Sequence, residues 1–383
     1  MASISKYENT AGKTLYRVRY RKPDHTNTDK RGFARKRDAE AFLNEIERAK
    51  RRGEYIDEAD SRVLIEDLGE QWLASKQNAM KASSYHSLEV SWNTHVKPKW
   101  GNYRLSDIRH NDIQQWVNQL SSGSPHSRPP VKAKSPTVVI RAEGILLGIL
   151  RSAVQDRRIL SNPAEGIILP RKKAKEHVYL SAEELMNLAE HCGNHQTLVL
   201  VLGLCGLRWG EAAGLRVEDV DFSHRTILVA RSATMVGNRI IIDSPKNGKP
   251  RKIVWPAILE PGLKEAVTGK RPSDPLFSEP EGDYISRRRA AGKAGSWFNR
   301  ALNETGLPAM SLHDLRHTAA SLMVSAGANV KAVQRQLGHA KASMTLDVYS
   351  DLFESDLQSV SLALNQIVSR TTVGKMWAEP SGK

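Results

Sequence analysis

Five short groups of residues in the second half of the chain could act together on a phosphate ester. In chain order they are an RxxE pair, a lysine before an Asn-Gly turn, an HxLRH run, an LGH run and a tyrosine: Arg208 with Glu211, Lys246, His313 with Arg316, His339, and Tyr349. Guanidinium groups bind phosphate oxygens bidentately and keep their charge. A phenol oxygen can attack phosphorus, and lysine or histidine can move protons. The set predicts phosphoryl transfer, with Arg208 and Arg316 clamping the phosphate that Tyr349 attacks.

The group that would protonate a leaving oxygen is a lysine near a turn. Lys246 precedes Asn247-Gly248, the strongest short signal for a β-hairpin, and a mobile hairpin tip can reach into a nucleic-acid groove. Lys249 and Lys252 lie close by and remain alternatives. The sequence therefore predicts Lys246 as general acid, with Lys249 as the first rival.

The histidines and the glutamate have supporting roles in this prediction. His313 and His339 would carry protons or orient the phosphate. Glu211 lies one helical turn after Arg208, so it can support the clamp or a neighbouring histidine.

Each residue also has an ordinary structural interpretation. Tyr349 alone is typical of a packed tyrosine, Arg208 of a helix-end arginine, and His339 of a helix cap. His313 and His317 are four residues apart, which also suits zinc, but an HExxH glutamate and a clear third ligand are missing. We therefore predict no metal and no cofactor.

The charge of the chain indicates a polyanionic partner. Lys and Arg number 57 against 42 Asp and Glu, so the formal net charge is +15. Residues 1–52 hold 15 of the basic and 7 of the acidic residues, which is more than half of the excess. Nucleic acid is the partner that this distribution favours.

The front end, residues 1–60, predicts a small three-stranded β-sheet packed on one helix. Residues 16–21 alternate, so a strand there would put Tyr16, Val18 and Tyr20 on one face and three arginines on the other: Arg17, Arg19 and Arg21. A second strand is expected over 30–33 and a helix over 36–52. The arginine face could bind DNA or could simply be a solvated surface.

The rest of the chain predicts a helical region, a basic linker and a mixed α/β region. Residues 62–168 show helical patterns over 64–77, 83–96, 106–121 and 136–157. The linker, 171–178, includes Lys172 and Lys173 as candidate DNA contacts. From Leu180 the pattern is helical to about Glu218, three short strands follow near 226–232, 238–243 and 251–255, and helices resume over 286–368 before a tail, 369–383.

Two other classes of protein are excluded. The sequence has no apolar run of membrane-spanning length, and its N-terminus lacks an apolar signal region. Two cysteines cannot make a disulfide framework or a cysteine-built zinc site. We expect a cytoplasmic protein.

The ordered series RxxE, hairpin lysine, HxLRH, LGH and Tyr resembles the tyrosine recombinase family, and the phage integrases in particular, over at least 180–352. The front end and the helical region resemble the arm-binding and SAM-like core-binding domains of lambda-like integrases. The resemblance implies a mainly α fold with small β elements. It also implies arm-type DNA binding by 1–60, core binding by 62–168 and catalysis by 179–368.

The same resemblance implies a reaction and its partners. A phage or prophage integrase cleaves and rejoins DNA strands through a 3′-phosphotyrosine intermediate and a Holliday junction. Its implied partners are core and arm attachment-site DNA, a homotetramer on that DNA, and, as candidates, a DNA-bending host factor and an excisionase. The implied place is the host cytoplasm, at the nucleoid.

Other functions are weighed against the integrase. A recombinase of an integrative plasmid or conjugative transposon is the nearest alternative. A Xer-type resolvase lacks the additional basic front end, and a type IB topoisomerase is disfavoured by the two DNA-binding regions. A non-catalytic DNA-binding regulator would not need the complete series of site residues.

Overall fold

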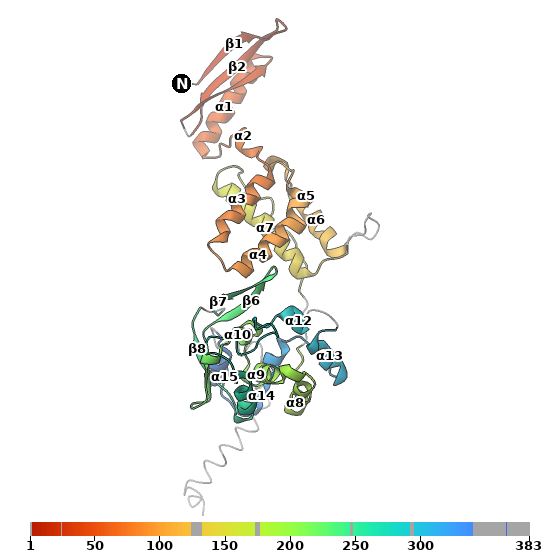
Figure 1. Ribbon diagram of the computed structural model, residues 1–383. Coiled ribbons are helices and arrows are strands. Elements are labelled where there is room, and N and C mark those ends of the chain that lie inside the picture. Colours follow the sequence, from red (N-terminus) through yellow and green to blue (C-terminus); the bar gives the residue numbers. More distant parts are fainter. Residues whose placement is uncertain are drawn as a thin grey trace, which may run out of the picture. The chain divides into compact units, whose positions relative to one another are not determined.

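The computed structural model describes residues 2–23, 25–123, 132–172, 177–245, 248–291, 295–339 and Asn365. These residues belong to two compact units, 1–173 and 174–383, coloured red to yellow and yellow-green to blue in Figure 1. The boundary falls inside the predicted basic linker, 171–178. Lys173, Lys246, Tyr349 and the predicted tail, 369–383, lie outside the described residues. None of the helices in the described ranges has the length and apolar character of a membrane span.

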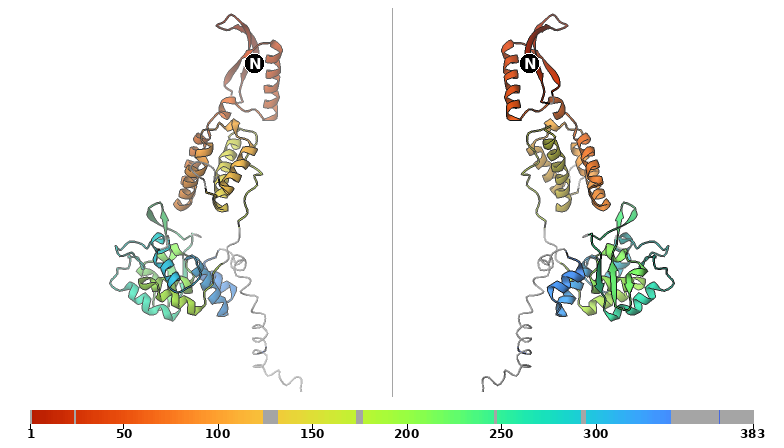
Figure 2. Two further views of the ribbon diagram at one scale, coloured as in Figure 1. Left: turned by 90° about the vertical axis from the view of Figure 1, so that its right-hand side faces the viewer. Right: turned by 90° about the vertical axis from the view of Figure 1, so that its left-hand side faces the viewer.

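The front end is a three-stranded antiparallel sheet with one helix, as predicted. The strands follow the order β1-β2-β3 and α1 lies along one face of the sheet (Figure 2), the bounds being β1 Ser3–Glu8, β2 Thr14–Arg21, β3 Asn27–Phe33 and α1 Lys36–Arg52. Val18 is fully buried, and the Tyr20 ring packs edge-on against Phe42 of α1 at 6.0 Å. Since side chains alternate along a strand, the three arginines of β2 lie on the opposite face.

The helical region has a core built around tryptophans. Trp92, Trp100 and Trp116 are buried between helices α3 Ile65–Gln77, α4 Ala82–Ser91, α5 Lys97–Trp100, α6 His110–Ser122 and α7 Pro136–Gln155, with short turns α2 Glu58–Ser61 and η2 Leu105–Asp107. The predicted helix over 83–96 runs on to Trp100 through a π-helical turn, η1 Trp92–Val96. Pro98 does not stop it, because proline is tolerated in the first turn of α5.

The second unit is mainly helical. Its helices are α8 Ala182–Glu190, α9 Gln196–Cys205, α10 Trp209–Ala213, α11 Glu260–Val267, α12 Arg287–Ala291, α13 Trp297–Glu304, α14 Asp314–Ser325 and α15 Val330–Leu337, with 3-10 turns η3 Gly193–His195, η4 Val217–Asp219 and η5 Ala257–Leu259. The region predicted as helical to about Glu218 consists of several short helices, because the chain is interrupted at η3 and again at Gly206. Gly206 has φ 71°, and a Cβ there would lie 2.4 Å from Leu337. Only glycine fits this close approach.

Among the described residues, the second unit has five strands, two more than the three predicted. The strands β4 Val220–Asp221, β5 Thr226–Val229 and β8 Arg251–Val254 form one antiparallel sheet, and β6 Ser232–Val236 pairs with β7 Arg239–Asp243. The predicted strand over 226–232 is therefore split between β5 and β6. Arg231, at the break, donates to both carboxylate oxygens of the buried Asp219 at 2.8 Å. This ion pair lies where β5 ends and the chain turns into β6.

Candidate active site

The RxxE pair forms at the start of α10. Arg208 precedes the helix in an extended conformation, and its backbone N–H donates to Glu211 Oε2 at 3.1 Å. Its guanidinium donates to Glu211 Oε1 at 2.9 Å, while the glutamate is 1% exposed. Glu211 therefore holds Arg208 through both its backbone and its side chain.

A second arginine, which sequence reasoning missed, holds the same glutamate from β8. The two Nη atoms of Arg251 donate to the two carboxylate oxygens of Glu211 at 3.1 and 2.7 Å. Burial by itself would raise the pKa of Glu211, but the bonds and charge of Arg251 and the charge of Arg208 lower it to about 2. The carboxylate therefore stays ionised at any working pH. The alternation of the strand could have revealed Arg251. Residues two positions apart share a face of a strand, and Arg251 lies two residues before the buried Ile253.

Arg251 also touches the LGH turn. Gly338 ends α15 with φ 67°, and an added Cβ there would lie 2.6 Å from Arg251 Nε. This glycine thus lets the turn before His339 pass against the guanidinium. Gln336, on α15, fixes the same helix to β8 by accepting from the Val254 N–H at 3.1 Å and donating to the Val254 carbonyl at 2.8 Å.

Arg316, the second arginine predicted to bind the phosphate, is buried on α14. Arg316 is 2% exposed, and its Nη1 donates to the carbonyl of Gly206 at 2.6 Å. Gly206 is two residues before Arg208, so this bond fixes Arg316 next to the segment that carries the first arginine. The two arginines come from segments more than 100 positions apart and meet here.

Burial and the positive charge of these arginines lower the pKa of both histidines. Burial, then the charges of Arg316, Arg208 and Arg251, lower the pKa of His339 to about 4. Burial and the charges of Arg316, Arg208 and Arg287 also lower the pKa of His313. Both rings are therefore largely neutral at pH 7 and can accept a proton.

Two cavities meet at Arg208. One, of about 530 Å³, is lined by Arg208, Glu211, Arg251 and His339 together with the basic side chains of Lys249, Lys252, Lys331 and Arg335. The other, of about 500 Å³, is lined by Arg208, His313 and Arg287 and by apolar side chains that include Trp209 and Met235. A phosphate bound at Arg208 would thus have one histidine toward each cavity.

The family is identified by two matches along the sequence. The phage integrase family matches residues 179–355, which include the RxxE pair and the two histidine runs described above. The N-terminal SAM-like domain of phage integrases matches residues 64–121, inside the helical region. The chain belongs to the phage integrase family. It is a tyrosine-type site-specific recombinase.

Relatives and solved structures agree with this assignment. The recombinase is 25% identical to a XerC-like tyrosine recombinase of Caldanaerobacter subterraneus, over 87% of this chain and 90% of that protein. It is 23% identical to the integrase of Mycobacterium phage L5, over 81% of each. Its fold matches a Tn1549 transposon integrase bound to a circular intermediate DNA, with a TM-score of 0.64, 21% identity, and coverage of 78% and 99%. It also matches a lambda integrase dimer bound to a core site, with a TM-score of 0.56, 15% identity, and coverage of 99% and 97%.

The structure of this recombinase brings together most of the predicted site. Arg208, Glu211, His313 and His339 line the two cavities, and the charge of the buried Arg316 acts on both histidines. Lys246 and Tyr349 lie outside the described residues, as does Lys173. The arginines of β2 and Lys172 belong to the first unit.

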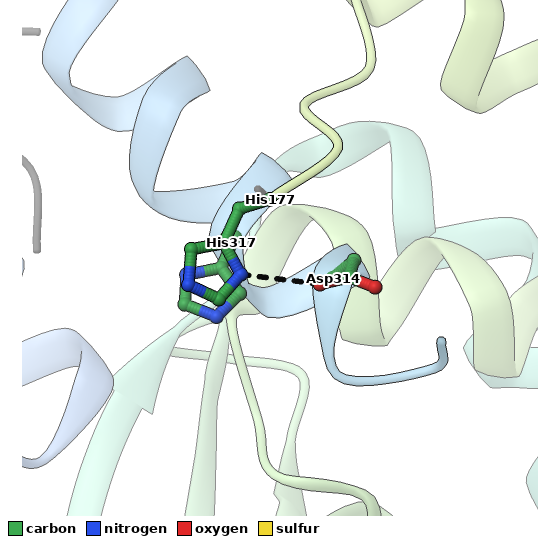
Figure 3. A group of neighbouring side chains, drawn as sticks. All are labelled: His177, Asp314 and His317. Atoms are coloured by element: carbon green, nitrogen blue, oxygen red, sulfur yellow. Dashed lines mark hydrogen bonds and ion pairs between the residues drawn. The ribbon is translucent and has the colours of Figure 1, made fainter. Parts of the chain in front are cut away.

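His313 and His317 are the pair whose four-residue spacing also suits zinc. Their rings are perpendicular, at 88°, with centroids 5.0 Å apart. His317 instead lies with Asp314 of the same helix and with His177, as Figure 3 shows.

Proposed function

We propose that this recombinase is a phage-type integrase that exchanges DNA strands through a 3′-phosphotyrosine intermediate. The observation that carries the proposal is the pair Arg208 and Arg316, held by Glu211 and by the Gly206 carbonyl beside two neutral histidines. Two fixed guanidinium groups stabilise the negative charge that develops on non-bridging oxygens.

The proposed chemistry is a balanced exchange of phosphoester bonds. The Tyr349 oxygen attacks the phosphorus and loses its proton to His313 or His339, which are neutral and can accept it. The bond to the 5′ oxygen breaks, and Lys246 protonates that oxygen. A 5′ hydroxyl of the partner strand then reverses the step and releases the tyrosine. The number of phosphoester bonds is unchanged, so the exchange needs no ATP.

The proposed partners follow from charge and from the relatives. We assign binding of arm-type DNA to residues 1–60 and binding of core-type DNA to 62–168 and 179–368. Lys172 and Lys173, in the linker, would contact the DNA backbone. A homotetramer is proposed because a related structure is a lambda integrase tetramer on a Holliday junction. A DNA-bending host factor and an excisionase would act through the arm contacts. We place this work in the host cytoplasm, at the nucleoid.

The test measures formation of a covalent protein–DNA adduct on a nicked duplex that carries the core site. The sequence of that site is found from the ends of the integrated element. The nick lets the cleaved strand diffuse away, so the adduct accumulates. Wild-type protein and Tyr103→Phe, a matched change at a partly exposed tyrosine of the helical region, should form the adduct. Tyr349→Phe should bind the duplex equally well and form none. An adduct that persists in Tyr349→Phe would overturn the proposal.

A further inference from the structure

The segment that enters the second unit is attached to α14 at four points. His177 stacks on the His317 ring, with centroids 3.9 Å apart and planes 30° apart. Its Nδ1 lies 3.4 Å from Asp314 Oδ1, and the Tyr179 ring packs edge-on against His317 at 6.4 Å. The Leu180 N–H donates to Thr318 Oγ1 at 3.2 Å. Residues 177–180 therefore run along the first turns of α14, on both sides of Arg316 in sequence.

On α14, Asp314 is held in place by two hydrogen bonds from Ser311. The Asp314 side chain is 2% exposed, and its Oδ2 accepts from the Ser311 N–H at 2.7 Å and the Ser311 hydroxyl at 2.8 Å. That arrangement aims Oδ1 at His177, whose side chain is 35% exposed (Figure 3). His177 therefore covers a buried carboxylate and a buried ring from the solvent side.

Three ligand atoms within 4.8 Å of one another invite a metal interpretation, which the ring geometry contradicts. The lone pair of an imidazole nitrogen lies in the plane of its ring, so two histidines that share a cation point their planes at it. Rings whose centroids lie 3.9 Å apart and whose planes are inclined by 30° keep their lone pairs in nearly parallel, offset planes, which do not converge on one cation. The arrangement suits a stack and a hydrogen bond, with the His177 N–H donating to Asp314.

We infer that His177 is a positioning residue that fixes the active-site arginine Arg316 by holding the entering segment against α14. Asp314 and His317, which it contacts, are next neighbours of the Leu315-Arg316 pair on a helix of 12 residues. A small rotation of this helix would move the Arg316 guanidinium and the His313 ring together. A misplacement of about 1 Å at a reacting centre can cost about 100-fold in rate. The inference rests on the proposed role of Arg316.

The position of His177 along the chain gives this contact a second consequence. It lies a few residues after the boundary between the two units, at the end of the basic linker. Residues 177–180 connect the linker to the rest of the second unit. A conformational change of the linker on DNA binding would therefore act on these residues first. Through their contacts with α14, these residues link the end of the linker to the helix that carries Arg316.

The test compares cleavage rate with DNA binding in single turnover on the same nicked duplex. We expect His177→Ala to slow adduct formation about 10-fold at saturating protein, with an unchanged dissociation constant. His177→Phe keeps the stack on His317 and should recover part of the rate. The matched control is His191→Ala, because the hydrogen bond of the His191 ring within the described part of the chain goes to the Asn187 carbonyl of its own helix. Equal rate constants for His177→Ala and wild type would overturn the inference.

Further readouts separate positioning from other roles. A merely structural role would lower the burst amplitude, which counts folded protein, and leave the rate constant of that fraction unchanged; this result overturns the inference. Stoichiometric binding of Zn²⁺ by calorimetry that is lost in His177→Ala would also overturn it, by showing that the rings turn to share a cation. Failure of wild type to form any adduct would instead refute the proposed function.

Discussion

Replacing Glu211 by glutamine should weaken the second unit strongly, because two arginines share one buried carboxylate. The pKa of Glu211 falls from 4.5 to about 2. Each pKa unit is about 1.4 kcal/mol, so ionised Glu211 contributes about 3 kcal/mol to the free energy of unfolding at pH 7. Since the folded pKa is depressed, this contribution is complete above pH 4.5 and is lost as the pH falls toward 2.

Hydrogen exchange of the α9 amides in the full-length protein measures this loss. These amides are buried in the core of the second unit, so their exchange reports the opening of that unit alone. Glu211→Gln should raise the opening constant about 100-fold at pH 7 and only about 10-fold at pH 3. The control is Glu218→Gln, because Glu218 is half-exposed in its ion pairs with Arg216 and Arg231 and should change the constant only a few-fold.

A second variant decides whether Arg251 is the main partner. Arg251→Ala combined with Glu211→Gln should cost less than the sum of the two single changes, by about 2 kcal/mol, since each single change already breaks the pair. The reasoning is refuted if Glu211→Gln exchanges as slowly as wild type, or if its difference from wild type is the same at both pH values.

Three further predictions concern the reaction and the front end. Lys246→Ala should slow cleavage about 10²–10⁴-fold, with rescue by a 5′-phosphorothiolate leaving group; rescue of Lys249→Ala instead would move the assignment to Lys249. Cleavage should proceed in EDTA, because Arg208 and Arg316 supply the charge that Mg²⁺ gives elsewhere; loss of cleavage in EDTA with binding intact, restored by Mg²⁺, would contradict this. Replacing Arg17, Arg19 and Arg21 by Gln should weaken binding to arm DNA and reduce its salt dependence, leaving core cleavage unchanged; equal footprints would show that the face is only solvated.

The sequence predicted the residue types of the site better than their contacts. Motif order named Arg208, His313, Arg316 and His339, because the chemistry fixes which side chains a phosphate needs. It missed Arg251, whose bond to Glu211 joins residues 40 positions apart, and His177, which meets Asp314 across 137 positions. Such long-range pairings leave no local pattern.

Local patterns also set the limits of the fold prediction. The alternation in β2 was sufficient because one face is buried by α1 and the other carries the arginines. In the region expected to be helical to about Glu218, α9 ends before Gly206, where Leu337 of α15 packs against the glycine, a tertiary contact that periodicity does not reveal. The strand over 226–232 divided where Arg231 turns to a buried Asp219.

The central claim is tested most directly by locating the covalent bond. The adduct formed on the nicked duplex would be digested with nuclease and protease, and the peptide that keeps a nucleotide would be sequenced by mass spectrometry. Strand exchange by the proposed mechanism would leave a nucleotide joined through its 3′ phosphate to Tyr349, with a free 5′ hydroxyl on the released strand. A nucleotide on any other residue, or a link through a 5′ phosphate, would contradict it.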